Sequence, residues 1–291
     1  MFAFVVSNGR SGSTLVHELL ARHPEVGFVS NLEDRIPGLP AGAGRCNNAV
    51  YRRVPAALTR KGRLRYAPSE AWRALGREVS PMLVRSPRDL LAADAMPWVA
   101  DRFRRFFSER ADAQGKPVFL HKLTGWPRSG FIRAVFPDAR FIHVVRDGRA
   151  VAASDLQVPW WRGWAGPEHM GCGPLSEADL AAWEASGRSF AVLAGLSWKI
   201  EMDAMLAARE LVPAEQWLDL RFEDLLDDPP AHFKSMLAFL GLEAHPQFDA
   251  ALARTEFRSD RKDAYRRQLN PADVAALDAA LAGHLRRWGY G

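Results

Sequence analysis

The sequence predicts an α/β fold in which a P-loop-like parallel sheet is flanked by helices. Short apolar runs typical of buried strands alternate with segments of helical periodicity. The first run, residues 2–6, leads through a loop of small residues directly into a helical segment, as in phosphate-binding loops. No internal repeat or linker divides the 291 residues, so we expect residues 1–291 to form a single domain.

The expected strands are continuous apolar runs, because strands of a parallel sheet are buried on both faces. They are residues 2–6 (FAFVV), 26–29, 117–121 (PVFLH), 140–145 (RFIHVV) and 216–220 (QWLDL). Helices are expected where apolar residues recur at helical spacing. They run from Ser13 to about Arg22, over 128–136, after Gly148, over 176–208, and through the C-terminal remainder with Pro271 in a first turn. Residues 36–68 and 157–175 have no clear period, and no element is predicted there.

Composition excludes several classes of protein. Hydrophobic residues make up 48% and charged residues 25% of the chain, which is typical of globular proteins and not of disordered or fibrous ones. No apolar stretch reaches the ~18 residues of a membrane span. The N-terminal MFAFVVSNGR lacks a cationic segment, which indicates a buried strand and not a signal peptide.

The basic and sulfur-containing residues narrow the expectation further. The net charge is only +5, too small for a dedicated nucleic-acid binder. Among the 39 basic side chains, arginines far outnumber lysines, and the arginine fork suits phosphate and sulfate oxygens. Cys46 and Cys172 are too few for a disulfide framework or a metal cage. A cytoplasmic location, with no metal and no nucleic-acid partner, is therefore expected.

The segment SNGRSGST, residues 7–14, is the first candidate anion site. It joins the first strand to a helix N-terminus, so successive backbone N–H groups and the helix dipole point at one concavity. The nucleotide triphosphatase pattern would require a glycine at Ser7 and a lysine at Ser13, so a magnesium-dependent ATPase or kinase is disfavoured. The expected anion ligands in this loop are Arg10, Ser11, Gly12, Ser13 and Thr14.

A second candidate anion site follows the strand at 140–145. Arg146 ends that strand at the carboxyl edge of the sheet, where ligands of open α/β sheets bind. Ser154 lies within the next helix, close enough to share an anion with Arg146. Two neighbouring anion sites predict a ligand with two separated phosphates. The alternative is that Arg146 forms a strand-end salt bridge, for instance with Asp147.

Together these segments resemble the sulfotransferase superfamily, whose members use 3′-phosphoadenosine 5′-phosphosulfate (PAPS). The matching segments are RSGST at 10–14, FPDARFIHVVRDGR at 136–149 with Ser154, RFEDLLDDP at 221–229 and WGY at 288–290. With an arginine in the first loop, the sequence resembles the bacterial and tyrosylprotein-type branch, which carries arginine at this place. The resemblance implies a sulfotransferase fold and a PAPS-dependent transferase that releases the bisphosphate PAP.

The resemblance also implies roles for the two anion sites. The loop at 10–14 would bind the 5′-phosphosulfate, with Arg10 also acting on the transferred group, and Arg146 with Ser154 would bind the 3′-phosphate. A sulfuryl group carries less charge than a phosphoryl group, so positioned cations and N–H dipoles can replace a divalent metal. We therefore expect metal-independent, in-line transfer to a hydroxyl of a small molecule, carbohydrate or peptide.

A carboxylate general base is expected to take the acceptor proton. In the similar tyrosylprotein branch a glutamate at about the place of Glu33 has this role, and Asp34 is a competitor because the spacing here is slightly longer. His121 is a further alternative, since histidine titrates near neutral pH. Lys122 matches a family lysine that contacts the bridging or sulfuryl oxygens, although the family's Lys-x-Pro is Lys122-Leu-Thr here.

Three further segments have candidate roles. The loop at 157–175 contains Trp160, Trp161 and Trp164 and is a candidate acceptor wall. The basic residues at 258–267 are candidates for closing over the donor, or form a solvated charged face. Trp198 and Phe222 either stack on the adenine or fill the core. The remaining functional alternatives are a degenerate P-loop kinase or NTPase and a non-catalytic PAP-binding protein of the same fold.

Overall fold

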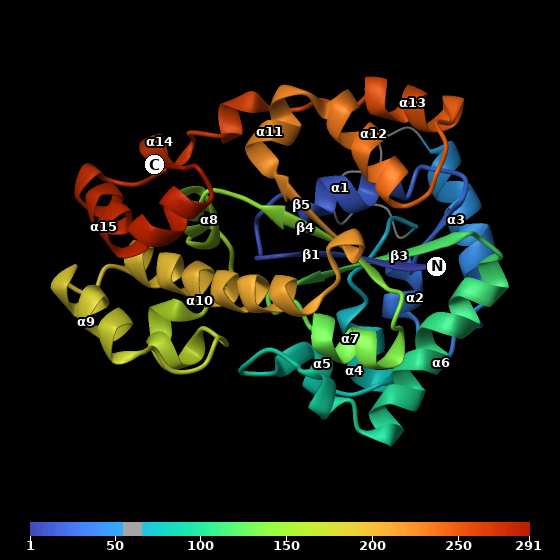
Figure 1. The fold of residues 1–291 in the computed structure, drawn as a ribbon, viewed down its shortest axis with the longest axis horizontal. Coiled ribbons are helices and arrows are strands. Elements are labelled where there is room, and N and C mark those ends of the chain that lie inside the picture. The colour runs from blue at the N-terminus through green and yellow to red at the C-terminus, as the bar shows by residue number, and fades with distance from the viewer. Residues whose placement is uncertain (55–65) are drawn as a thin grey trace.

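The protein is described here by a computed structural model that covers residues 1–54 and 66–291. Its centre is a five-stranded sheet in the order β2-β3-β1-β4-β5 (Figure 1). The strands are β1 Phe2–Ser7, β2 Val26–Gly27, β3 Val118–Thr124, β4 Arg140–Val145 and β5 Trp217–Arg221. All neighbouring strands are parallel, so the predicted α/β architecture is confirmed.

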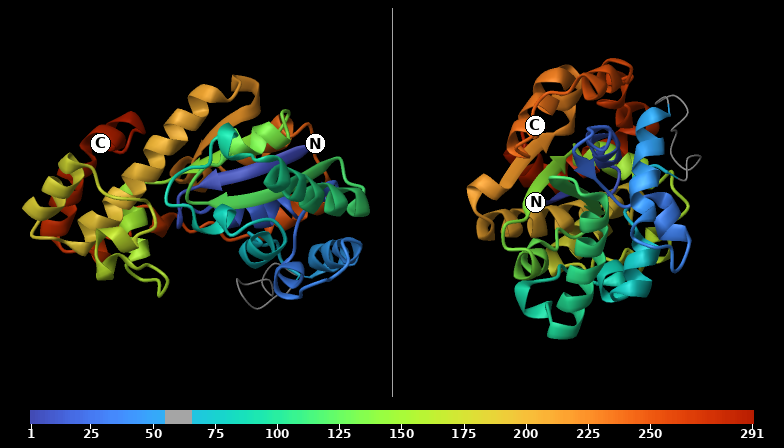
Figure 2. Two further views of the ribbon diagram at one scale, coloured as in Figure 1. Left: turned by 90° about the horizontal axis from the view of Figure 1, so that it is seen from below. Right: turned by 90° about the vertical axis from the view of Figure 1, so that its right-hand side faces the viewer.

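Helices cover both faces of this sheet, as the two views of Figure 2 show. The helices are α1 Ser13–Leu20, α2 Asn31–Arg35, α3 Ala43–Arg53, α4 Trp72–Glu78, α5 Met82–Arg85, α6 Pro97–Gln114, α7 Ser129–Val135, α8 Gly148–Asp155, α9 Glu177–Ala185, α10 Phe190–Leu211, α11 Phe222–Asp227, α12 Pro229–Phe239, α13 Pro246–Ala253, α14 Tyr265–Gln268 and α15 Pro271–Arg287. Pro271 occupies the first turn of α15 after the Asn270 cap, as predicted.

Two apolar layers hold the sheet. On one face, side chains of β1, β3 and β4 pack against phenylalanines of α6 and α7, including Phe103, Phe107 and Phe131. On the other face, alternate residues of the same strands pack against α1, α11, α12 and α13. Burial on both faces explains why the strands are continuous apolar runs.

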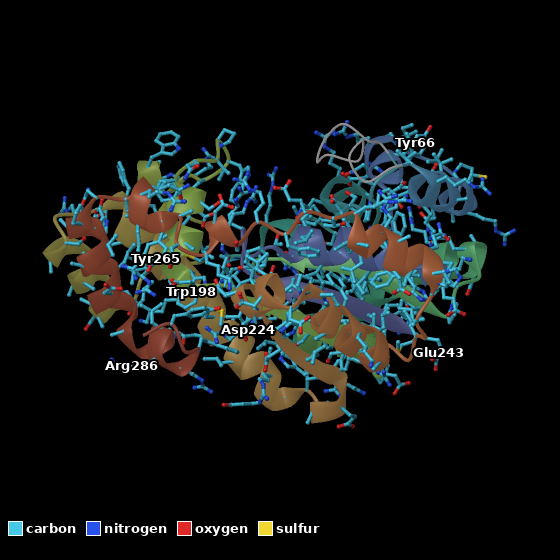
Figure 3. All side chains as sticks on the ribbon, turned by 90° about the horizontal axis from the view of Figure 1, so that it is seen from above. Tyr66, Trp198, Asp224, Glu243, Tyr265 and Arg286 are labelled. Atoms are coloured by element: carbon cyan, nitrogen blue, oxygen red, sulfur yellow. The ribbon has the colours of Figure 1, made fainter. Side chains whose placement is uncertain are left out.

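A third cluster joins α8, α10 and α15 beside the sheet. Trp198 of α10 lies inside this cluster, and Tyr265 packs on the alanines of α8 (Figure 3). A Cβ on Gly148 would lie 2.6 Å from the Trp198 ring. Since only glycine permits this approach, Gly148 sets how closely the start of α8 packs against α10.

The strand predicted at 26–29 is shorter than expected. β2 ends at Gly27 because the backbone of Phe28 is bound by the side chain of Gln114, which accepts from its N–H and donates to its C=O at 3.0 Å each. Those bonds replace further pairing with β3.

The helix predicted over 176–208 is two helices, α9 and α10. Gly187 and Arg188 between them have φ of +71° and +61°, which a continuous right-handed helix does not allow. Part of the region 36–68, for which no element was predicted, forms α3. Residues 55–65 of that region lie outside the described residues. The 18-residue helix α6 was also not predicted.

Candidate active site

The parallel strands bring the predicted anion sites to one edge of the sheet. In the register, Ser7 at the end of β1 pairs with Thr124 at the end of β3, and Val145 at the end of β4 pairs with Arg221. The loops that follow these strands therefore share the carboxyl edge, where open α/β sheets bind ligands.

The loop after β1 has the backbone of an anion cradle. Arg10 and Gly12 both have positive φ, +64° and +87°, and such turns direct successive N–H groups to one side. A Cβ on Gly12 would lie 2.2 Å from Phe222, so this position requires glycine for both its conformation and its packing. Phe222 thus packs against the loop at Gly12. Both Phe222 and Trp198 are buried, and both contribute to packing.

The hydroxyl groups of the loop differ in their partners. Ser7 donates to Ser13 at 2.7 Å, and Thr14 accepts from Lys122 Nζ at 2.7 Å. The hydroxyl of Ser11 is buried and has no hydrogen-bond partner among the described residues. A buried orphan hydroxyl beside a helix N-terminus is a ready donor for an anion.

The second predicted site contacts the first directly. Arg146 donates from Nη1 to the carbonyl of Arg10 at 2.8 Å and from Nη2 to the carbonyl of Arg261 at 3.0 Å. Its Nε is buried without a partner among the described residues. Arg10 in turn donates from Nε to the Ser154 hydroxyl at 2.9 Å. Arg10, Arg146 and Ser154 therefore form one cluster.

The strand-end salt bridge considered for Arg146 is not formed within the described residues. The carboxylate of Asp147 instead binds Arg149, with Nη2 to Oδ2 at 2.7 Å, and caps the start of α8 by accepting from the Arg149 N–H. No carboxylate lies within ion-pair distance of Arg146 in the part of the chain that the structure describes. Its charge is therefore not neutralised by a neighbouring side chain.

The two C-terminal segments of the resemblance also meet at this edge. Glu223 accepts from the Tyr290 hydroxyl at 2.7 Å and from the Asp147 N–H at 3.2 Å. Arg221 donates to the carbonyl of Gly289 and lies over the Tyr290 ring at 4.7 Å. These contacts fix the turn after β4 from which Arg146 projects.

A third group of side chains follows β3. The ammonium group of Lys122 lies 2.5 Å from Glu70 Oε1 and also donates to Thr14. Glu70 Oε2 accepts from Thr124 at 3.1 Å and from the Trp72 indole. Burial alone would raise the pKa of Glu70, but the charge and hydrogen bonds of Lys122, with those of Trp72 and Thr124, hold it below its ordinary value.

Comparison with known proteins agrees with this geometry. The model of the sulfotransferase family matches residues 3–246, which is most of the chain. The protein belongs to the sulfotransferase family. The predicted resemblance to the sulfotransferase superfamily is thereby confirmed.

Two curated relatives are mycobacterial, as expected of the bacterial branch. Both are named omega-hydroxy-beta-dihydromenaquinone-9 sulfotransferase Stf3, from Mycobacterium bovis and Mycobacterium tuberculosis, and each is 26% identical over 196 residues. The matched segment covers 64% of this chain and 44% of each relative. The chain thus matches less than half the length of these relatives.

Solved structures share the fold. The sulfotransferase STF9 from Mycobacterium avium aligns with a TM-score of 0.59 and 18% identity, over 98% of this chain and 76% of that one. STF1 from Mycobacterium tuberculosis H37Rv gives 0.55 and 18%, over 97% and 76%. The sulfotransferase domain of the curacin biosynthetic pathway gives 0.53 and 14%, over 96% of each chain. The predicted sulfotransferase fold is confirmed.

The carboxylate of Glu33 does not reach the cluster around Lys122. Its side chain is 1% exposed, and Oε2 accepts from the N–H and hydroxyl of Ser30 at 2.8 Å each, forming a capping box at the start of α2. Arg110 lies 3.7 Å from Oε1. Burial raises the pKa of Glu33, against the opposing effects of Ser30 and Arg110.

The two alternative bases also have structural partners. Asp34 accepts from the N–H groups of Arg73 and Ala74 at 2.9 and 3.0 Å, at the start of α4. His121 projects to the opposite face of the sheet from Lys122, and its Nε2 lies 3.1 Å from the carbonyl of Glu70. Burial lowers the pKa of His121 to about 3, which leaves it neutral and supporting the backbone of Glu70.

Sequence reasoning missed Glu70. It lies 52 positions before Lys122, beyond the irregular region at 36–68, and no apolar period marks it. One weak signal existed: it follows a Pro-Ser pair and precedes a tryptophan and a helical segment. Only the fold brings it to the end of β3.

The loop at 157–175 borders the loop after β1, residues 7–14, which we call the donor loop after the role proposed for it below. It contains two short 3-10 turns, at Gly163–Ala165 and Pro167–His169. Trp160 and Trp164 are 58% and 62% exposed, and Trp160 lies 3.6 Å from the position of a Cβ on Gly9. Trp161 instead packs toward Phe190, with ring centroids 6.0 Å apart. The three tryptophans thus divide into exposed and packed ones.

Behind the donor loop lie two buried carboxyl groups. Glu201 of α10 accepts from Asn8 Nδ2 at 2.9 Å, and Asp155 ends α8 with Oδ1 unpartnered among the described residues. Burial raises the pKa of Glu201 to about 7 and that of Asp155 to about 8. Near neutral pH this side of the loop therefore carries less negative charge than two ordinary carboxylates.

The basic segment 258–267 contacts Arg146 through its backbone. Arg261 supplies the carbonyl that Arg146 binds, while Arg258 pairs with Asp260 at 2.8 Å and Lys262 pairs with Asp227.

Among the residues described, no helix combines the length and hydropathy that crossing a membrane requires. Over the same residues, no cluster of three or more His, Cys, Asp or Glu has the arrangement of a metal site.

Proposed function

We propose that the protein transfers a sulfuryl group from PAPS to a hydroxyl acceptor by in-line, metal-independent transfer. The observation that carries this proposal is the contact between the two anion-binding elements, in which Arg10 bonds Ser154 and Arg146 bonds the Arg10 carbonyl. A donor with a 5′-phosphosulfate and a 3′-phosphate requires two such sites side by side. The membership in the sulfotransferase family supports the same reaction.

The donor would be held by the residues that the sequence singled out. The loop N–H groups, with Ser11, Gly12, Ser13 and Thr14, would bind the 5′-phosphosulfate, and Arg146 with Ser154 would bind the 3′-phosphate. The buried, unpartnered Ser11 hydroxyl and Arg146 Nε supply donors that fit phosphate or sulfate oxygens. Arg10 and Lys122 add positive charge where the leaving phosphate gains negative charge.

In the transfer step the sulfur–oxygen bond to the donor phosphate breaks as a bond to the acceptor oxygen forms. The acceptor proton passes to a carboxylate, and PAP leaves with the bridging oxygen. The position of Glu70 favours it as this carboxylate, because it lies beside Lys122, which bonds Thr14 of the donor loop. Glu33 and Asp34 remain the sequence-based predictions for the same role, and their carboxylates cap α2 and α4.

The acceptor class follows from the chemistry and from the relatives. The two curated relatives are named for an omega-hydroxy substrate derived from a dihydromenaquinone, which supports a hydroxyl on a small molecule. Trp160 and Trp164 expose their rings beside the donor loop, and such rings stack on aromatic or sugar acceptors. A small-molecule, carbohydrate or peptide hydroxyl fits this wall.

The test is a transfer assay with sulfur-labelled PAPS and a panel of acceptors: a phenol, a long-chain alcohol, an oligosaccharide and a tyrosine peptide, with and without EDTA. Labelled product with EDTA present supports the proposal. Binding of PAP without transfer to any acceptor would favour a non-catalytic PAP-binding protein. Binding of ATP only with magnesium would favour the kinase alternative.

A further inference from the structure

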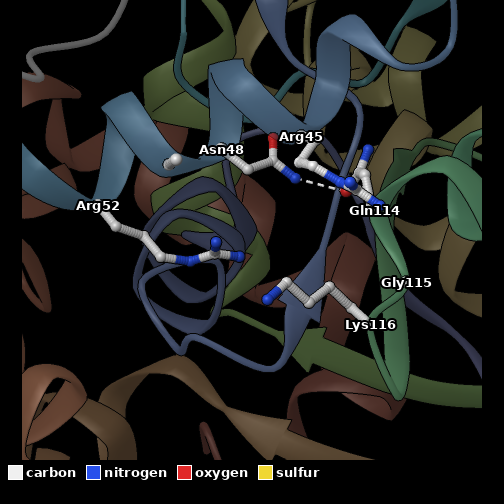
Figure 4. Close-up of a pocket in the computed structure, with 7 residues that line it drawn as sticks. Arg45, Asn48, Arg52, Gln114, Gly115 and Lys116 are labelled. Carbon is white, nitrogen blue, oxygen red and sulfur yellow. Dashed lines mark hydrogen bonds between the residues drawn. The ribbon is translucent and has the colours of Figure 1, made fainter.

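A basic cavity lies at the opposite end of the sheet from the donor loop. It has a volume of ≈330 Å³ and is lined by Arg45, Asn48, Ala49, Arg52, Gln114, Gly115 and Lys116. These residues come from α3 and from the turn that joins α6 to β3 (Figure 4). The seven residues of β3, at about 3.3 Å each, separate this cavity from the end of the strand where Thr124 lies. It is therefore distinct from the proposed donor site.

Three cationic side chains meet in this cavity without an acidic partner. No acidic residue is among the described residues that line it. Arg45 and Lys116 form no hydrogen bond or ion pair within residues 1–54 and 66–291. In Figure 4 the guanidinium of Arg52 and the ammonium group of Lys116 extend toward each other. Like charges brought together in this way repel unless an anion lies between them.

Arg52 is held in place by the backbone. Its Nε donates to the carbonyl of His23 at 3.1 Å, and Nη2 donates to the carbonyl of Val26. These carbonyls satisfy hydrogen bonds but do not neutralise the charge. A second anchor is Gln114, whose Oε1 accepts from Asn48 and Phe28. The floor of the cavity is therefore rigid, and one of its cations is fixed.

The charge environment of Lys116 agrees with this geometry. Burial lowers its pKa, and the positive charges of Arg52 and Arg45 lower it further, while Glu25 opposes them without forming an ion pair. A bound anion would remove this repulsion. Removing the lysine charge would remove it as well.

We infer that this cavity binds an oxyanion of the phosphate or sulfate class, held by Arg45, Arg52 and Lys116. Arginine forks and a lysine ammonium match tetrahedral oxyanions. The volume exceeds the ~30 Å³ that one water occupies in the liquid by about tenfold, so the site has room for a free ion or for an ester group carried by a larger molecule. Such an anion would fasten α3 to the turn before β3.

The test measures thermal unfolding of the full chain at low ionic strength, titrated with inorganic phosphate. Arg45→Gln and Lys116→Gln each remove one charge, and Lys234→Gln on the exposed face of α12 is the matched control. Arg146→Gln is included because the proposed donor site, to which Arg146 belongs, would also bind anions. In each cavity variant, we expect the phosphate concentration that gives half of the thermal shift to rise about tenfold. In Lys234→Gln this concentration should not change.

Two results separate this inference from the proposed function. In Arg146→Gln, the phosphate shift assigned to the cavity should persist, whereas binding of PAP should weaken. Without phosphate, Lys116→Gln should be at least as stable as the unmodified protein, because it relieves repulsion. If Arg45→Gln and Lys116→Gln respond to phosphate like the unmodified protein, or if only Arg146→Gln loses the response, the inference is wrong.

The source of the anion is distinguished by comparing probes. Inorganic phosphate and glucose 6-phosphate are titrated against the unmodified protein and against Arg45→Gln, with PAP present in saturating amount. Equal affinity for the two probes, lost in the variant, indicates a free ion. Tighter binding of the sugar phosphate, lost in the variant, indicates an ester on a larger molecule. No binding of either probe would overturn the inference.

Discussion

Arg10 donates its Nε–H to the hydroxyl of Ser154 at 2.9 Å, joining residues 144 positions apart in the sequence. The bond connects the loop after β1 with the helix after β4, which are adjacent only because β1 and β4 pair in the sheet. Arg146 strengthens the connection by binding the Arg10 carbonyl. The two proposed phosphate-binding elements are thus in direct contact, and damage to either should affect the binding of a single ligand.

Arg146→Ala should weaken binding of PAP by about 10–100-fold. A hydrogen bond to a charged group contributes about 1.5–3 kcal/mol. The variant would lose such a bond between the guanidinium and the 3′-phosphate. Binding of 5′-AMP, which lacks that phosphate, should change little. Isothermal titration of both nucleotides measures the difference, with the exposed Arg105→Ala of α6 as control. Equal weakening of both nucleotides would contradict the assignment.

Gly12→Ala should destabilise the protein by about 2 kcal/mol or more and abolish PAP binding. The new methyl group would meet Phe222 at 2.2 Å, and φ of +87° is unfavourable for alanine. Gly283→Ala is the matched control, because nothing lies within 4 Å of its Cβ position. In the interior of α15 that change should stabilise by up to about 1 kcal/mol. Urea denaturation measures both; similar effects of the two changes would contradict the packing argument.

Glu70→Gln should reduce kcat by about 10²–10⁴-fold, the usual contribution of a general base, with little change in PAP affinity. Because the pKa of Glu70 is held below its ordinary value, the carboxylate stays ionised at neutral pH. The acid limb of the unmodified enzyme's rate should therefore lie below the ordinary glutamate range.

Glu33→Gln provides the comparison for that experiment. It keeps an oxygen that can accept from the Ser30 N–H in the capping box of α2, but it removes the negative charge that faces Arg110. Because a hydrogen bond to a charged acceptor contributes about 1 kcal/mol more than one to a neutral acceptor, we expect a loss of stability of about 1 kcal/mol and a smaller effect on kcat. A large loss of kcat in Glu33→Gln at unchanged stability, with an active Glu70→Gln, would restore the sequence-based prediction. The contrast is measured by pH-dependent steady-state kinetics together with thermal unfolding.

Much of the site was predictable from local sequence. Local sequence predicted two buried strands, one followed by a glycine turn at Gly12 and the other by Arg146. The structure places both strand ends at one edge of the sheet, as expected. Glu70 was not predictable in this way. Its proximity to Lys122 depends on where residues 66–71 lie against the end of β3, which no short-range pattern encodes.

The helices show a similar division. The helical C-terminal segment with Pro271 in a first turn was predicted, and the structure has α15 there, whereas α6, which also begins with a proline, was not predicted. The helix over 176–208 was predicted as continuous because its apolar period continues across Gly187 and Arg188, whose positive φ values interrupt it. For Glu33, the resemblance to the tyrosylprotein branch implied a catalytic role, whereas its side chain accepts a hydrogen bond from the backbone of Ser30.

Asp219→Asn should remove a stabilisation that the unmodified protein has at neutral pH and loses in acid. Burial raises the pKa of Asp219, but hydrogen bonds and charge from His143, with hydrogen bonds from Trp217 and Arg209, lower it from its ordinary 3.8 to about 2. A carboxyl with a depressed folded pKa stabilises the fold above its unfolded pKa, and this stabilisation is lost as pH falls toward 2. It amounts to about 2 kcal/mol at neutral pH. Unfolding followed from pH 7 to 2 should show a shallower decline in the variant than in the unmodified protein; parallel curves would contradict the assignment.

Trp160→Ala should raise the acceptor KM by about 2–10-fold, since ring stacking contributes about 0.5–1.5 kcal/mol, while PAP affinity and stability change little. The side chain is 58% exposed beside the donor loop, so its loss leaves no cavity. Trp98→Ala on α6, where the ring is 50% exposed, is the control. An unchanged acceptor KM, or equal changes in both variants, would exclude Trp160 from the acceptor wall.

The central claim is that the joined anion sites bind a nucleotide carrying both a 3′- and a 5′-phosphate. The most direct measurement is a thermal-shift titration with PAP, 5′-AMP and ATP, each with and without magnesium. A ligand at about 100 times its Kd adds about 2.7 kcal/mol to the free energy of unfolding, which is readily detected. Selective stabilisation by PAP, independent of magnesium, is the predicted result. Stabilisation by magnesium-ATP alone, or by none of the three nucleotides, would contradict it.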